Sequence, residues 1–316
     1  MESMKFLPSM DSKASLPFSD EKRKTYQAIL KTVFYADIFD YPLTEEEVYR
    51  FISPILKPRE STRGDIKKAN GVIRHKDNFM FLKGQERLIG LRKKKEEHSR
   101  KKLLIAKRIA SILKHIPTIK LVGVSGSVAI GNADKHHDID FFIITSTGTL
   151  WFTRLLTTIA VELFGKRRRP GDTDVTDKIC LNMFVDERFL AIAETRRNLY
   201  TAHDVCQLKV LFDRDNTYER FLAANEWVRK FLPNAVSSIR YQVLGIRRKQ
   251  KNTYYIIHAA YYILEWLAKH LQLWYMRKRL TTETITDGYL AFHPKDYTKD
   301  VLSAFQERVR YYASQI

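Results

Sequence analysis

Residues suited to chemistry gather in one stretch of the chain. Gly126 and Ser127 follow the apolar run 121–124, and Asp138 and Asp140 stand at the start of the next apolar run. Glycine lets the backbone approach a ligand closely, and a helix that begins there would point free N–H groups at phosphate. Positions two apart on a strand face the same way, so both aspartates can hold Mg²⁺, which shares oxygen ligands with phosphates. The stretch therefore predicts metal-assisted phosphoryl or nucleotidyl transfer.

Short elements must position these side chains. We expect a strand over 121–124, a small-residue turn over 125–127 and the start of a helix over 128–130. A polar loop over 131–137 then leads into a second strand, which ends in the apolar run 141–144. This order would aim the turn and the two acids at the same spot.

The same residues resemble the active-site signature of the DNA polymerase β-type nucleotidyltransferase superfamily, which is Gly-Ser, a spacer and Asp-x-Asp. Here the match is Gly126-Ser127, ten residues, and Asp138-Ile139-Asp140, with a spacer similar to that of minimal and antibiotic nucleotidyltransferases. The resemblance implies an α+β fold, in which helices flank a mixed β-sheet. It also implies that the glycine and serine bind the nucleotide, and that the two aspartates are catalytic and hold Mg²⁺ or Mn²⁺.

Other interpretations of these motifs explain less. A plain strand–turn–strand with two surface acids remains an alternative. A haloacid-dehalogenase-type phosphatase would want Thr or Val two residues past the second aspartate, where this chain has Phe142. A glycosyltransferase with Asp-x-Asp would leave Gly126 and Ser127 unexplained. His136 and His137 could contribute to a zinc site, but the chain has no spaced Cys/His set to complete one.

A third carboxylate comes from a later strand in this superfamily, and the chain departs from that pattern. The matching strand is predicted over 178–185, where alternation puts Cys180, Asn182 and Phe184 on one face and the residues between them on the other. Asn182 is then the natural occupant of the third-acid position, with Asp186 further along as a substitute. Asparagine cannot accept a proton and is a poorer metal ligand, so turnover is in question.

Charge is distributed unevenly along the chain. The protein has 316 residues, 44% of them hydrophobic, which is typical of a globular chain, and a net charge of +19. Residues 51–120 hold 20 Lys or Arg against 6 Asp or Glu, whereas residues 121–200 hold 10 against 10. The basic segment would attract a polyanion such as nucleic acid, although a solvated helix would show the same composition.

The cysteines and the apolar runs bear on location. Two cysteines in apolar surroundings argue against a disulfide framework and for a reducing compartment, hence a cytoplasmic protein. The N-terminal residues lack the apolar core of a signal peptide. Charged residues interrupt the apolar runs 150–165 and 254–276, so we expect buried helices there and no membrane span.

The N-terminal region resembles the winged-helix segment that precedes the catalytic domain in a group of bacterial and archaeal nucleotidyltransferase-domain proteins. After a leader over 1–20, residues 21–85 have the order of a winged helix-turn-helix, with two helices, a basic third helix and a hairpin. A capping box, Thr44 with Glu47, starts the second helix. The basic helix, 59–70, would contact nucleic acid, with candidate phosphate contacts at Lys67, Lys68 and Arg74.

The remaining segments complete the predicted organisation. A basic linker helix spans 86–116, the nucleotidyltransferase domain spans 117–215, and a helical C-terminal domain spans 216–316. A helix is also expected to follow the third-acid strand up to residue 202. The aromatic residues of the helix predicted over 254–279, such as Tyr262, Trp266 and Trp274, are expected to be core.

Two functions are consistent with these features. The first is an enzyme that transfers a nucleoside monophosphate from an NTP to a hydroxyl of a nucleic acid, protein or small molecule. The second is a regulator that senses nucleotides or binds nucleic acid through the winged helix, with weak catalysis. The replaced third acid and the basic segment favour the second; the intact Gly-Ser and Asp-x-Asp favour the first.

Overall fold

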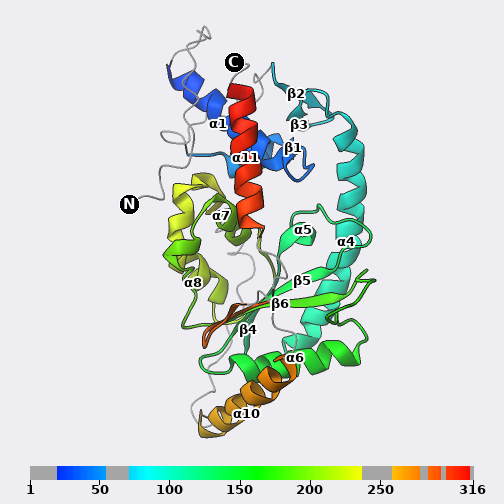
Figure 1. The fold of residues 1–316 in the computed structure, drawn as a ribbon, viewed down its shortest axis with the longest axis vertical. Coiled ribbons are helices and arrows are strands. Elements are labelled where there is room, and N and C mark those ends of the chain that lie inside the picture. The colour runs from blue at the N-terminus through cyan, green and yellow to red at the C-terminus, as the bar shows by residue number, and fades with distance from the viewer. Residues whose placement is uncertain (1–19, 55–70, 237–257, 278–283, 293–296, 314–316) are drawn as a thin grey trace.

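A mixed β-sheet lies at the centre of the part of the chain that the structure describes (Figure 1). The structure is a computed structural model that describes residues 20–54, 71–236, 258–277, 284–292 and 297–313. The sheet has six strands in the order β7-β4-β5-β6-β9-β8; β5 and β6 are parallel, and the other neighbours are antiparallel. The strands are β4 (Ile119–Val124), β5 (Ile139–Thr145), β6 (Ile179–Asp186), β7 (Lys209–Asp213), β8 (Thr284–Ile285) and β9 (Tyr289–Ala291). The predicted mixed sheet is confirmed.

Helices cover both faces of the sheet, which explains why its central strands are apolar on both sides. On one face, α4 and α6 bury residues such as Ile109, Phe141 and Trp151; on the other, α7 and α8 bury Phe142 and Phe221. The helical segments are α4 (Arg87–Leu113), α6 (Leu150–Leu163), η1 (Glu194–Arg196), α7 (Leu199–Gln207), α8 (Thr217–Ala224) and η2 (Glu226–Lys230). The prediction of a helix directly after β6 is therefore wrong, because that segment contains the short η1 and α7 begins only at Leu199.

A smaller N-terminal unit, α1 to β3, precedes the sheet. Its elements are α1 (Asp20–Asp37), β1 (Leu43–Thr44), α2 (Glu45–Phe51), β2 (Ile73–Lys76) and β3 (Phe79–Leu82). The predicted hairpin is present, and so is the capping box, with Thr44 Oγ1 accepting from the Glu47 N–H at 3.2 Å. Arg74 is exposed on β2. The helix predicted over 59–70, with Lys67 and Lys68, lies outside the described residues, so the winged helix stays a prediction.

The N-terminal unit contacts the loop that follows the glycine–serine turn. The Tyr41 hydroxyl lies 2.7 Å from the Ile130 carbonyl oxygen, and Asn132 Nδ2 donates to the Phe39 carbonyl at 2.9 Å. The buried Arg92 guanidinium of α4 lies 3.7 Å from the centre of the Tyr41 ring and binds the Pro42 carbonyl, which fixes this tyrosine. The N-terminal unit is thus fixed directly against the loop of the candidate site.

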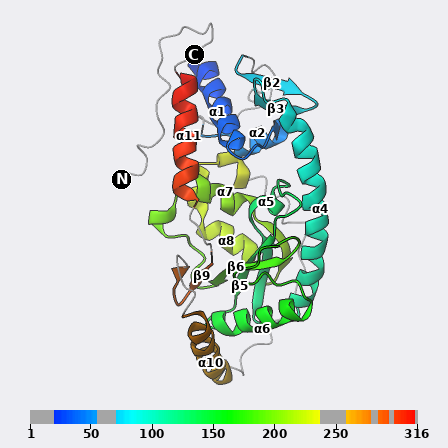
Figure 2. The same cartoon turned by 45° about the vertical axis from the view of Figure 1, so that its right-hand side comes forward.

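The described C-terminal segments pack against the rest of the protein in two places, and the separate helical domain stays a prediction. The strands β8 and β9 extend the central sheet from β6, and α10 (His258–Met276) packs against α6. The last helix, α11 (Thr298–Ala313), packs beside α1 in the N-terminal unit (Figure 2). Strands of two or three residues are too short to show a period in the sequence, which is why they were missed.

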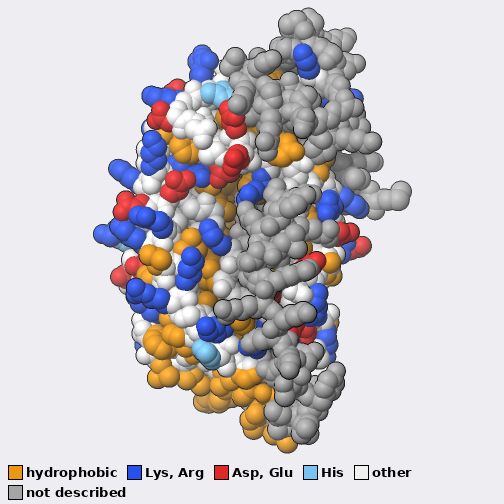
Figure 3. All heavy atoms as spheres, turned by 180° about the vertical axis from the view of Figure 1, so that it is seen from behind, with side chains coloured by type: hydrophobic (Ala, Val, Ile, Leu, Met, Phe, Trp, Pro, Cys, Tyr) orange, Lys and Arg blue, Asp and Glu red, His pale blue; other side chains and the backbone are white. Residues whose placement is uncertain are grey.

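Hydrophobic side chains of α6 and α10 are exposed at the lower end of the molecule (Figure 3). Trp274 is 73% exposed, and Tyr262 and Trp266 are also exposed, so the expectation that these residues are core is wrong. Two polar residues of α10 face inward: Gln272 is buried, and Glu265 accepts from the Trp151 N–H at the start of α6 at 2.8 Å. Among the described helices, none combines the length and apolarity needed to cross a bilayer.

Candidate active site

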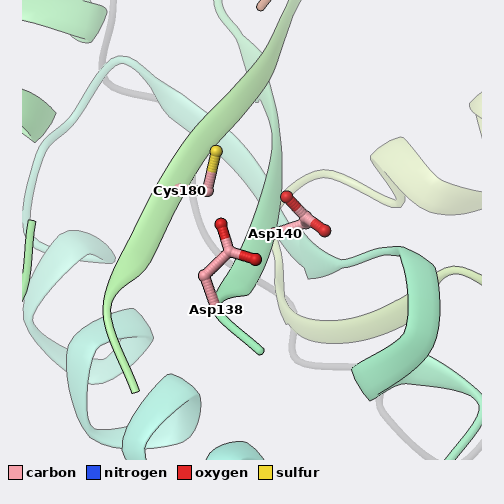
Figure 4. A group of neighbouring side chains, drawn as sticks. All are labelled: Asp138, Asp140 and Cys180. Carbon is pink, nitrogen blue, oxygen red and sulfur yellow. The ribbon is translucent and has the colours of Figure 1, made fainter. Parts of the chain in front are cut away.

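Two carboxylates and a thiol converge at the start of β5 and β6 (Figure 4). Asp138 directly precedes β5, Asp140 is its second residue, and Cys180 is the second residue of β6, opposite Asp140 in the parallel register. One oxygen of each carboxylate and Cys180 Sγ all lie within 4.8 Å of one another. The structure therefore brings the two predicted acids together, beside a cysteine that is not among the predicted site residues.

The glycine–serine turn lies against the second acid. Gly126 begins the short helix α5 (Gly126–Ala129) with φ of +64°, a left-handed conformation that L side chains rarely adopt. A Cβ at this position would come within 3.2 Å of Asp140 Oδ2. The Ser125 N–H also donates to the Asp140 carbonyl at 3.0 Å, so the turn and the acid are held together by the backbone.

We expect Gly126→Ala to lower nucleotide binding and turnover by about 10- to 100-fold. The methyl group combines a strained positive φ, which costs on the order of 1 kcal/mol, with a displacement of the Asp140 carboxylate. The measurement is the KM and kcat for NTP. Gly148→Ala is a matched control, because Gly148 also has a positive φ, of +67°, but a Cβ there would meet nothing within 4 Å. Equal losses in both variants would show that strain alone, and not the contact with Asp140, matters.

Ser127 carries a hydroxyl whose partner is a histidine. Ser127 Oγ lies 3.1 Å from His137 Nδ1, which also accepts from the Asp134 N–H at 3.4 Å, so the serine donates to this nitrogen. His136 Nδ1 lies 3.3 Å from Thr176 Oγ1. Among the described residues, the group of potential metal ligands at this site contains neither histidine, so a zinc site that uses His136 and His137 gains no support.

The two neighbouring carboxylates give the site an unfavourable concentration of negative charge. Burial, and then the negative charge of Asp138, raise the pKa of Asp140 to about 7. The guanidinium of Arg168 lies 2.6 Å from Asp138 Oδ2 and 3.8 Å from Cys180 Sγ, and it partly offsets this effect. Burial and both carboxylates raise the pKa of the Cys180 thiol well above its ordinary value, so the thiol is protonated here and hydrogen-bonds Asp140.

The structure corrects the alternation that assigned the third-acid position. In β6, Leu181 and Asn182 together stand opposite Phe141 of β5, because the register shifts by one residue between Cys180 and Met183. This bulge reverses the faces that simple alternation predicts beyond it. Asn182 is buried in the bulge, and it is Cys180 that the register pairs with Asp140.

Asp186, the other candidate for the third acid, lies at the end of β6 that is far from Asp138 and Asp140. It pairs with Thr145 in the register, about 16 Å along the strand from Asp140. Its fully buried carboxylate accepts from the Gly148 N–H at 2.6 Å and from the Arg188 guanidinium at 2.9 Å. The proposal that Asp186 substitutes for a third acid is therefore wrong, and its hydrogen bonds give it a structural role.

A buried lysine holds the loop that leads to Asp138. Lys102 of α4 is 1% exposed, and its Nζ donates to the carbonyls of Lys135 and His137 at 2.9 and 2.6 Å. The same ammonium group pairs with Asp177 Oδ1 at 2.8 Å. This lysine was not predicted as a site residue, since a basic helix gives no sequence signal for one buried cation.

Comparison with known families agrees with the geometry. Residues 106–170 match the family model of the nucleotidyltransferase domain, a range that includes Gly126, Ser127, both aspartates and Arg168 but ends before Cys180. No curated protein and no solved structure gives a significant match to the chain. The part of the chain that carries the glycine–serine turn and the two aspartates is thus similar to the nucleotidyltransferase domain, which supports nucleotidyl transfer in general.

The residues of the site fit a divalent cation. Two carboxylates this close repel each other, as the raised pKa of Asp140 indicates, and a cation relieves the repulsion. The oxygens of Asp138 and Asp140 and the sulfur of Cys180 would be its ligands. Arg168 supplies the positive charge in the arrangement described here.

Proposed function

We propose that the protein is a divalent-metal-dependent nucleotidyltransferase that transfers a nucleoside monophosphate from an NTP to a hydroxyl acceptor. One observation supports this most: the Gly126 turn lies against Asp140, with Asp138 beside it. Phosphate-binding N–H groups and metal-binding carboxylates would then bind the same triphosphate. Acceptors in reach of this chemistry are a nucleic acid end, a protein hydroxyl or a small molecule.

Each residue has a distinct part in the proposed reaction. The backbone around Gly126 and the Ser127 hydroxyl bind the β- and γ-phosphates. Asp138 and Asp140 would hold Mg²⁺ or Mn²⁺, and the ion would neutralise charge that develops on the phosphates. The acceptor oxygen attacks the α-phosphorus and loses its proton, while the bond from that phosphorus to the bridging oxygen breaks and pyrophosphate leaves.

Arg168 is placed to change partners when the nucleotide binds. Its guanidinium is about one-third exposed, and its loop, 166–171, contains four basic residues in succession. Triphosphate oxygens would compete with Asp138 for this guanidinium, because arginine binds phosphate in the same bidentate way as carboxylate. Release of Asp138 would leave its oxygens free for the cation.

Pyrophosphate release tests the proposal. The wild-type protein should release pyrophosphate from ATP or CTP when a divalent ion and an acceptor are present, and Asp138→Asn should release none. Asp134→Asn is the matched control, since Asp134 is exposed on the same loop and belongs to no metal-ligand group. Turnover that survives in Asp138→Asn would overturn the assignment of this site.

A second candidate function is a nucleotide-responsive protein that binds nucleic acid. Two observations favour it: among the residues that the structure describes, no third carboxylate joins Asp138 and Asp140, and α4 carries a basic stripe on its solvent face (left edge of Figure 3). The helix is about 40 Å long, enough to follow several phosphates of a duplex. The stripe comprises Lys93, Lys94, Arg100, Lys101, Lys107 and Arg108, all exposed.

Charge reversal in this basic stripe tests the second candidate. Lys94→Glu, Arg100→Glu and Lys107→Glu together should lower nucleic-acid affinity and reduce its slope against log salt by up to about 3. The measurement is a binding titration at several salt concentrations. The control has the same net charge, with Lys209→Glu, Lys230→Glu and Arg310→Glu at exposed sites elsewhere. Equal losses in both triple variants would indicate a general charge effect and no binding stripe.

A further inference from the structure

Cys180 occupies a position that makes it more than a packing residue. Its Sγ lies within 4.8 Å of a carboxylate oxygen of both Asp138 and Asp140, and the parallel register holds it opposite Asp140. Figure 4 shows the thiol and the two carboxylates close together on adjacent strands. The side chain is partly exposed and lies 3.8 Å from the Arg168 guanidinium. These neighbours are polar, unlike those of Cys206, which is buried in an apolar cluster.

Sulfur changes which ion this trio of donors prefers. Thiolate is a soft ligand that binds Zn²⁺ and similar ions strongly, whereas Mg²⁺ prefers oxygen ligands in octahedral geometry. Two carboxylates and one thiolate are also a sufficient set for a catalytic zinc site, which keeps a fourth position open for substrate. A coordinating ion displaces the thiol proton, so the protonated thiol of the free site does not prevent binding.

We infer that Cys180 is a direct ligand of the ion held by Asp138 and Asp140, and that it gives the site a preference for thiophilic ions such as Zn²⁺ over Mg²⁺. This inference rests on the proposed function, because it concerns the ion of the same site. It differs from a site built of oxygen ligands alone, in which Mg²⁺ has no sulfur competitor. The competing explanation is that the thiol serves only as a neutral hydrogen-bond donor to Asp140.

Cadmium is the probe that separates these explanations, because a Cd²⁺–thiolate bond gives a charge-transfer absorption in the ultraviolet. Titration of the full-length, metal-free protein with Cd²⁺ should produce this band with a stoichiometry of one ion per chain. Cys206→Ser should keep the band, and Cys180→Ser should lose it. Absence of the band in the wild-type protein, or its persistence in Cys180→Ser, would overturn the inference.

A second variant guards against a folding defect and tests the selectivity. Cys180→Asp restores an all-oxygen site, so its affinity for Zn²⁺ relative to Mg²⁺, measured by competition, should fall at least about tenfold. An unchanged ratio would contradict the inference. Failure of this inference is distinguishable from failure of the proposed function. Turnover with Mg²⁺ but no cadmium band refutes only the role of Cys180 as a ligand. A cadmium band without any turnover refutes only the proposed nucleotidyltransferase activity.

Discussion

Asp140→Asn should abolish nucleotidyl transfer and, in the absence of metal, make the protein more stable. Loss of one carboxylate ligand removes several kcal/mol of transition-state stabilisation, so we expect turnover to fall at least about 10³-fold. The neutral amide has nearly the same shape, and it ends the repulsion with Asp138 that burial intensifies.

The pH dependence of that stability follows from the sign of the pKa shift. The pKa of Asp140 rises from an ordinary value of about 3.9 to about 7 in the folded protein. The wild-type protein therefore loses stability relative to Asp140→Asn as the pH rises from about 4 to about 7, and the difference is then constant. At pH 8 the gain should be on the order of 2–4 kcal/mol.

Thermal unfolding of both proteins with a chelator, from pH 4 to pH 8, is the measurement. The melting temperature of Asp140→Asn should exceed that of the wild type by several degrees at pH 8 and match it near pH 4. Asp134→Asn, on the exposed part of the loop, should show no such trend. A variant that is less stable than the wild type at pH 8 would contradict the electrostatic description of the site.

Lys102→Met should destabilise the protein by about 1–3 kcal/mol and lower activity as well. Methionine fills a similar volume, but it leaves the carbonyls of Lys135 and His137 without their donor and Asp177 without its cation. The loop that carries Asp138 would then loosen. The measurements are denaturant unfolding and the rate of pyrophosphate release.

Lys101→Met is the matched control for this change. Lys101 is the preceding residue of α4, but its side chain is 63% exposed and pairs only with Glu97 of the same helix among the described contacts. Exposed pairs of this kind contribute little to stability, so the variant should remain near the wild-type stability. Similar losses in the two variants would mean that the buried ammonium group does not hold the loop.

The sequence predicted those parts of the site that local residues determine. Gly126 and Ser127 lie in a turn between apolar runs, and Asp138 and Asp140 open the next strand, so spacing alone was enough to place them. The structure brings these residues together, while their catalytic roles stay predictions. The capping box at Thr44 was also predictable, because its hydrogen bonds join residues three apart.

Features that depend on tertiary register could not be predicted in this way. A one-residue bulge in β6 shifts the register after Cys180, and nothing in the local pattern marks it, so alternation along the strand does not place Asn182 correctly. Arg168 reaches Asp138 from a loop 30 residues away. The apolar pattern of α10 looks the same whether its aromatic face is buried or exposed, so Trp274 was assigned to the core.

The fate of the α-phosphate tests the central claim most directly. The protein is incubated with a divalent ion, a lysate as the source of acceptors, and NTP labelled at either the α- or the γ-phosphate. Nucleotidyl transfer predicts that the α-label becomes covalently attached to an acceptor while the γ-label appears only in pyrophosphate, and that Asp138→Asn does neither. Attachment of the γ-label to the acceptor, or α-label transfer that persists in Asp138→Asn, would contradict the account.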